Sequence, residues 1–116
     1  MDERIEKAMA VANYMATLSN QRRAILEEYN QKLVYYINGA TFRVDYNIIN
    51  FAKNLVDLGH TESVAFVDAN NQPVIIEDVQ DFLDNLLSVY FEAVNEYQNK
   101  FSEIKRKRNV KDLVDL

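Results

Sequence analysis

Few residues in this chain are of a type that performs chemistry. His60 is the only histidine, and the absence of cysteine excludes a disulfide, a thiolate nucleophile and a thiolate metal site. A histidine acts as general base when a nucleophile or carboxylate is arranged beside it, and no such arrangement is evident around His60. Gly39 and Gly59 are too far apart to form a phosphate-binding loop. The sequence therefore predicts no catalytic residue and no cofactor.

One acidic segment is similar to the start of a calcium-binding loop. Asp68, Asn70 and Gln72 alternate as in that loop, but the loop requires glycine at its sixth position and a carboxylate at its twelfth. Pro73 and Val79 stand there instead, so we expect a solvated turn. Further carboxylates follow at the start of a long helix, where they are ordinary partners of the helix dipole. They are Glu77, Asp78, Asp81 and Asp84. No metal site is predicted.

The formal net charge is −5, and basic residues are concentrated near the end of the chain. Such a cluster can contact phosphate, or it can stabilise the end of a helix through the dipole. The acidic remainder repels nucleic acid, so we expect none as a partner. The cluster consists of Lys105, Arg106, Lys107 and Arg108. No apolar run long enough for a signal peptide or a membrane span is visible, so we expect a soluble protein that is intracellular or carried inside a particle.

The longest regular pattern lies in residues 79–107, which contain neither glycine nor proline. Apolar residues recur there at steps of three and four, which predicts a helix with one apolar face. A second apolar row widens this face beyond what one neighbouring helix covers. We therefore predict self-association, as a dimer or trimer, with a coiled-coil or four-helix bundle as the dimer. The predicted interface is Leu83, Leu86, Tyr90, Val94, Tyr97, Phe101 and Ile104.

A second long helix is predicted for residues 3–32. Acidic residues occupy its first turn, where the dipole favours them. Its apolar stripe, interrupted by Arg22, is Ile5, Ala8, Ala12, Met15, Leu18, Ile25, Tyr29 and Leu33.

Residues 33–77 combine strand and turn signals. Asn38-Gly39 between two β-rich runs indicates a hairpin, although a helix reaching Ile37 and ending at Gly39 is the competing interpretation. Asp45 is a candidate N-cap for a short helix that ends near Gly59. A second hairpin is predicted around the turn at residues 68–72, with Pro73 at the start of a strand.

The predicted fold class is α+β, mostly α, in a single domain 1–116. Two long antiparallel helices (3–32 and 79–107) form a stalk, and two hairpins with a short helix form a head at 33–77. Residues 108–116 form a tail, and within it acidic and apolar residues alternate over 110–116. Leu113, Val114 and Leu116 can dock in a groove on a partner, or fold back on the stalk.

Several segments resemble small proteins of contractile-tailed phages, particularly those of marine cyanobacteria. These are residues 38–42 (Asn-Gly-Ala-Thr-Phe), 48–51 (Ile-Ile-Asn-Phe), 66–74 and the acidic-capped helix that follows. They are also similar to a domain of unknown function encoded beside phage tail-fibre genes. The resemblance covers about residues 35–108 and implies a non-enzymatic structural or assembly role in or near the virion tail, with other phage structural proteins as partners. The alternative is an intracellular adaptor that docks a host or phage polymerase or clamp through its C-terminal tail.

Overall fold

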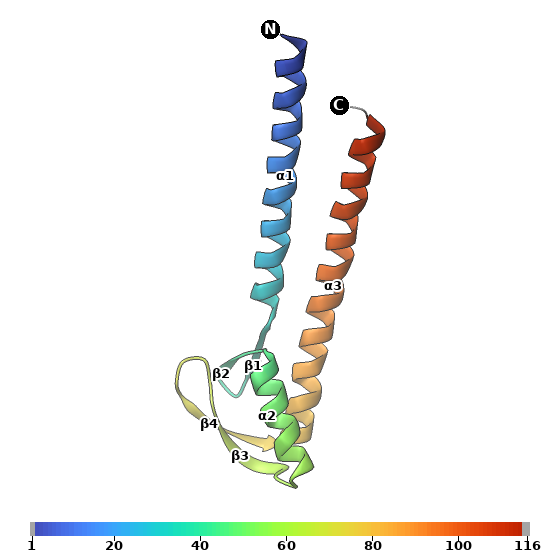
Figure 1. Ribbon diagram of the computed structural model, residues 1–116. Coiled ribbons are helices and arrows are strands. Elements are labelled where there is room, and N and C mark those ends of the chain that lie inside the picture. The colour runs from blue at the N-terminus through green and yellow to red at the C-terminus, as the bar shows by residue number, and fades with distance from the viewer. Residues whose placement is uncertain (1, 115–116) are drawn as a thin grey trace. The chain divides into compact units, whose positions relative to one another are not determined.

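The computed structural model describes the backbone of residues 2–114 and the side chains of residues 2–106. It contains three helices and two antiparallel hairpins, which confirms the predicted class, α+β and mostly helical. Figure 1 shows these elements in chain order. They are α1 (Glu3–Lys32), β1 (Val34–Ile37), β2 (Ala40–Arg43), α2 (Tyr46–Asp57), β3 (Glu62–Val67), β4 (Pro73–Asp78) and α3 (Val79–Val114).

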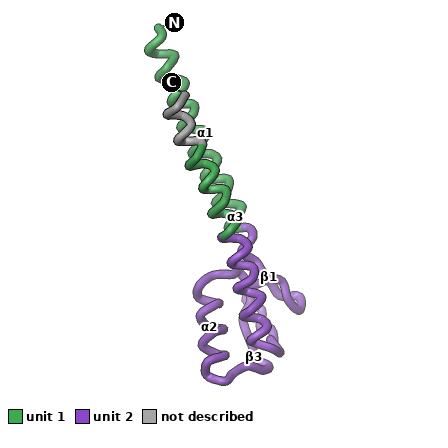
Figure 2. The backbone as a smooth tube through the Cα atoms, turned by 90° about the vertical axis from the view of Figure 1, so that its right-hand side faces the viewer, with its two compact units in different colours: residues 1–30, 95–116 green, residues 31–94 purple. Residues whose placement is uncertain are grey.

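The chain forms two compact units, coloured separately in Figure 2. Unit 1 is Met1–Asn30 with Asn95–Leu116, and unit 2 is Gln31–Val94. Helix α3 therefore contributes its first residues to unit 2 and the rest to unit 1. Within unit 1 the two helices run antiparallel, since Tyr29 contacts Tyr97 and the earlier Arg22 contacts the later Phe101.

The first hairpin is confirmed, and the competing helical interpretation is wrong. Strands β1 and β2 pair in register from Val34 opposite Arg43 to Ile37 opposite Ala40. The two turn residues, Asn38 and Gly39, have φ values of 52° and 76°. A two-residue hairpin turn of this kind needs positive φ at both positions, which Asn-Gly tolerates best.

Both predicted ends of α2 are also present. The side chain of Asp45 accepts a hydrogen bond of 2.9 Å from the backbone N–H of Ile48, so it caps the first turn. At the other end Gly59 adopts φ 85°, and the backbone N–H of His60 donates to the carbonyl of Leu55 at 2.8 Å. This bond is the hallmark of a Schellman motif, for which glycine is the preferred residue. The backbone N–H of His60 therefore helps to cap the C-terminus of α2.

Helix α3 begins as predicted and ends later than predicted. The carboxylate of Asp78 accepts from the backbone N–H of Asp81 at 3.0 Å, which caps the N-terminus. The sequence predicts that the helix ends at residue 107 and is followed by a tail over 108–116, but the helix continues to Val114. The physical reason is the absence of any glycine or proline stop signal after Lys107.

The core of unit 2 is built around three phenylalanines from three different elements. Phe42 of β2, Phe66 of β3 and Phe82 of α3 contact one another, with ring centroids 5.0 to 6.3 Å apart. All three contacts are edge-to-face, a geometry that aromatic rings prefer. Besides Phe42 and Phe82, the fully buried large side chains, all apolar, are Val44, Ile76, Val79 and Leu86. This cluster joins both hairpins to the start of α3.

Candidate functional site

Three of the seven residues predicted to form the self-association interface are buried within their own chain. Leu83 and Leu86 lie in unit 2, where Leu86 is fully buried, and Ile104 is buried in unit 1. Because neighbouring parts of the same chain already cover these side chains, a second copy cannot contact them in this conformation. The other four are half-buried: Tyr90, Val94, Tyr97 and Phe101.

The half-buried aromatic residues of unit 1 lie between its two helices. Tyr97 stacks on Tyr29 with ring centroids 4.9 Å apart, and Phe101 contacts Tyr97 at 6.1 Å. The guanidinium of Arg22 and the ammonium of Lys105 lie 5.7 and 5.4 Å from the centre of the Phe101 ring. Such cation–π contacts allow charged side chains to pack in an apolar seam. These residues bind the two helices of one chain to each other.

Tyr90, the aromatic residue of the predicted interface that lies in unit 2, faces the first turn of α2. Its hydroxyl lies 3.1 Å from that of Tyr46, and the two ring centroids are 5.7 Å apart. Tyr90 also makes an edge contact with Phe91, whose side chain is 54% exposed.

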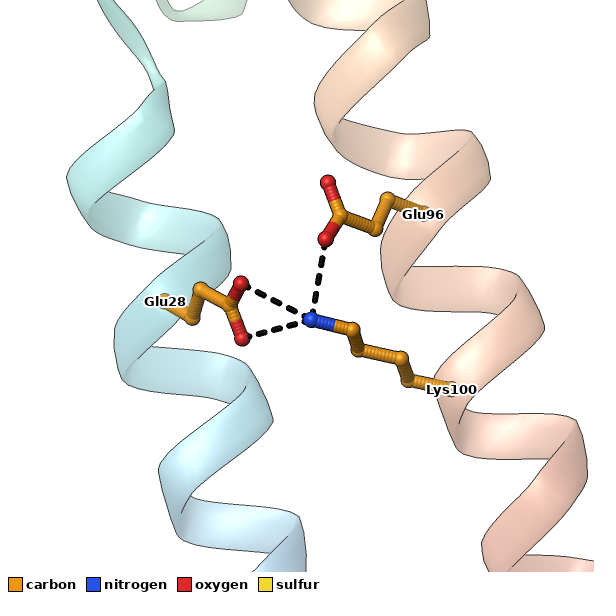
Figure 3. Close-up of polar contacts among 3 residues, drawn as sticks. All are labelled: Glu28, Glu96 and Lys100. Carbon is orange, nitrogen blue, oxygen red and sulfur yellow. Dashed lines mark hydrogen bonds and ion pairs between the residues drawn. The ribbon is translucent and has the colours of Figure 1, made fainter.

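An ion pair network crosses the two helices of unit 1 (Figure 3). The Lys100 ammonium lies 2.8 Å from both carboxylate oxygens of Glu28 on α1 and 2.9 Å from Glu96, one turn earlier on α3. Hydrogen bonds from Lys100 to Glu28 first, and to Glu96 second, raise the pKa of Lys100 above its usual value. The charged lysine is therefore favoured in the folded state.

Asp68 is the buried acidic residue of the segment that is similar to a calcium loop. Its carboxylate accepts backbone N–H bonds from Gln72 at 2.8 Å, Asn70 at 2.9 Å and Thr41 at 3.1 Å. The bonds from Gln72 and Thr41, and more weakly from Asn70, lower the pKa of Asp68 against the opposing effect of burial. The backbone N–H of Ala69 in turn donates to the carbonyl of Thr41 at 2.8 Å. The carboxylate thus attaches the turn of the second hairpin to the first hairpin.

The clearest uncovered apolar surface of unit 1 lies on α1. Its residues are spaced by alternating steps of three and four, and we call them the outer seam. Ile5, Met15 and Leu26 are 51%, 47% and 43% exposed. Arg22 and Tyr29, which also contact α3, are half-buried, and the rest are exposed. The outer seam consists of Ile5, Ala8, Ala12, Met15, Ser19, Arg22, Leu26 and Tyr29.

Unit 2 carries an open groove of about 560 Å³ between α2 and the ends of β2 and β3. Phe51, which is half-exposed and packs edge-on against Phe66 at 5.5 Å, forms part of its apolar wall. Arg43, Asp45 and Asp68 supply polar groups to the lining. Of these, Asp45 and Asp68 accept backbone hydrogen bonds within the chain.

No family model, curated protein or solved structure matches this chain.

Within the part of the chain that the structure describes, no cluster of three or more histidine, cysteine or acidic side chains is placed to hold a metal ion. No described helix is both long and apolar enough to cross a membrane. His60 is exposed. Leu113 and Val114 of the predicted docking tail belong to α3, but their side chains and Leu116 lie outside the described residues.

Sequence reasoning missed the role of Asp68 and the outer seam. The bond from Asp68 to Thr41 joins residues 27 positions apart, which no local pattern reveals. The outer seam could have been found from its spacing, because Ile5, Ala8, Ala12 and Met15 already belonged to the predicted stripe. Periodicity alone did not show that α3 contacts only Arg22 and Tyr29 of this seam and leaves the others exposed.

Proposed function

We propose that this protein is a non-enzymatic structural or assembly protein of a phage, which self-associates through its long helices and acts as an adaptor in or near the virion tail. The observation that carries the self-association is the outer seam of α1. An exposed apolar stripe along a helix is unfavourable in water and is typical of a surface that another helix covers. Ile5, Met15 and Leu26 on this stripe are each about half-exposed in the single chain.

The assignment to a phage tail is supported by the resemblance of residues 35–108 to small proteins of contractile-tailed phages. In this proposal the stalk, formed by the two long antiparallel helices, mediates self-association. The head, at residues 33–77, contacts other phage structural proteins. The open groove beside Phe51 and Arg43 is one surface of the head that offers both apolar and charged contacts.

Light scattering tests the self-association directly. The chain has a mass of 13.5 kDa, so a dimer or trimer is readily distinguished from a monomer across a dilution series. Met15→Glu, which places a charge on the outer seam, should shift the mass toward the monomer. Ala24→Glu is the matched control, because Ala24 is exposed on the opposite side of α1. A monomer at every concentration would overturn the proposal.

Mass spectrometry of purified particles tests the location. The virion role predicts that the protein is found in intact, extensively washed particles at a fixed ratio to the tail proteins. Its presence in the infected-cell lysate combined with absence from the particles would refute that role.

A further inference from the structure

The outer seam of α1 has the spacing of a coiled coil and a distinctive order of side-chain sizes. Its steps of three and four give the 3.5-residue repeat of a left-handed coiled coil. Alanine and serine occupy the seam at positions 8, 12 and 19, and larger side chains occupy the rest. The positions with small side chains lie mostly toward the start of the helix, and the larger Arg22, Leu26 and Tyr29 lie toward its end.

We propose that the outer seam binds the outer seam of a second copy of this chain, with the two α1 helices antiparallel and residue i facing residue 34 − i. This inference rests on the proposed self-association and specifies its geometry. In this register Ala8 faces Leu26, Ala12 faces Arg22 and Met15 faces Ser19, while Ile5 faces Tyr29. Three of these four pairings combine a small side chain with a large one, which fills space evenly.

A parallel dimer of the same seam is less favourable for two reasons. Each residue would face its own copy, so Ala8 and Ala12 would form thin layers between wide layers of Ile5 and Met15. The two Arg22 side chains would also face each other, and like charges in contact repel. In the antiparallel register the two Arg22 positions are ten residues apart along the helix axis, about 15 Å, which exceeds the screening length of roughly 8–10 Å.

Two further points favour the antiparallel pair. The dipoles of two antiparallel helices lie side by side and point in opposite directions, so each positive helix end lies beside a negative one, which is favourable. The contact is smaller than a standard interface, which uses roughly 20–30 residues a side. We therefore expect a dissociation constant in about the micromolar range, and the experiments should be done above it.

Disulfide trapping tests the register, since the chain contains no cysteine and each introduced thiol is unique. An equimolar mixture of Ala8→Cys and Leu26→Cys chains should form mainly the mixed disulfide under mild oxidation. These positions are 18 residues apart, about 27 Å along the helix, so neither variant should bond to its own copy. The matched control is a mixture of Ala10→Cys and Ala24→Cys chains. These two positions obey the same register, but both lie on the opposite, exposed side of α1. This mixture should give little product.

A pair of charge variants tests the same register without oxidation. Ala12→Glu places a carboxylate opposite Arg22 of the second copy, whereas Ala12→Arg places a like charge there. We expect the dimer of Ala12→Arg to dissociate at least about tenfold more readily than that of Ala12→Glu. A parallel dimer would instead bring either variant against its own copy and weaken both. Ala12 is exposed in the single chain, so both variants should fold.

The outcomes separate this inference from the proposed function. Disulfides only within each variant would indicate a parallel dimer and overturn the register. A dimeric mass with no mixed disulfide would overturn the use of the outer seam but leave self-association through another face. A monomeric mass up to high micromolar concentration would overturn both.

Discussion

Replacing Phe82 with alanine should produce one of the largest losses of stability in this protein. Phe82 is fully buried, and its ring contacts those of Phe42 and Phe66 at 5.0 Å and that of Tyr35 at 5.9 Å. Deleting a buried phenylalanine side chain costs about 3–5 kcal/mol through lost burial and the cavity left behind. Each favourable ring pair adds about 0.5–1.5 kcal/mol beyond its buried area. With three ring neighbours, we expect a loss of about 4–5 kcal/mol for Phe82→Ala.

Phe91→Ala is the matched control, because it is the same substitution in the same helix. Phe91 is 54% exposed and contacts one aromatic ring, that of Tyr90, at 5.5 Å. We expect a loss of about 1 kcal/mol or less for this variant. The free energy of unfolding is measured by urea titration followed by far-ultraviolet circular dichroism.

The comparison between the two variants tests whether the three phenylalanines form the core of unit 2. A domain is stable by about 5–15 kcal/mol, so Phe82→Ala removes a large share and can prevent folding altogether. In that case Phe82→Leu, with an expected loss of about 1–2 kcal/mol, keeps the comparison measurable. If the Phe82 variants lose no more stability than Phe91→Ala, then the three-phenylalanine cluster is not the core of unit 2.

Three other predictions concern a turn and two ionisable groups. Gly39→Ala should lower the free energy of unfolding in urea by about 1–2 kcal/mol, because φ is 76° there and the added methyl group meets nothing that would compensate. The pKa of Lys100 is raised in the folded state, so the stability that its charge contributes is complete below the usual lysine pKa and is lost as pH rises through the raised value. In Glu28→Gln, the melting temperature should therefore fall less over that alkaline range. The pKa of Asp68 is lowered in the folded state, so the stability that its carboxylate contributes is present above the usual aspartate pKa and is lost as pH falls through the folded value. Asp68→Asn should therefore make the urea midpoint depend less on pH over that acidic range. An unchanged pH dependence would contradict the assignment.

Local signals in the sequence predicted the elements well, because each depends on neighbouring residues. Asn38-Gly39 indicated the first hairpin through the positive φ that both residues adopt. Asp45 and Gly59 indicated the two ends of α2 through capping chemistry. These features need no knowledge of the rest of the chain, which is why a single sequence reveals them.

The partner of each helical face could not be predicted from local pattern. Leu83 and Leu86 have the spacing expected of an interface, yet the hairpins of unit 2 share a buried core with them. On α1 the outer seam follows a 3.5-residue repeat, whereas the face toward α3 includes the buried Leu18 and the half-buried Ile25. An α-helix drifts by about 20° per heptad relative to a 3.5 repeat, so one apolar pattern can divide into two faces. Periodicity identifies such residues as apolar contacts but does not identify what they contact.

The bonds around Asp68 have a consequence for how proteases act on this protein. Exposed turns between strands are usual cleavage sites, because a protease must draw several residues of backbone into an extended shape within its cleft. Residues 68–72 form such a turn, yet the amides of Asn70 and Gln72 are held by the Asp68 carboxylate and that of Ala69 by Thr41. Drawing this segment out would break all of these bonds together. The turn should therefore resist digestion while the native fold persists, despite its position at the surface.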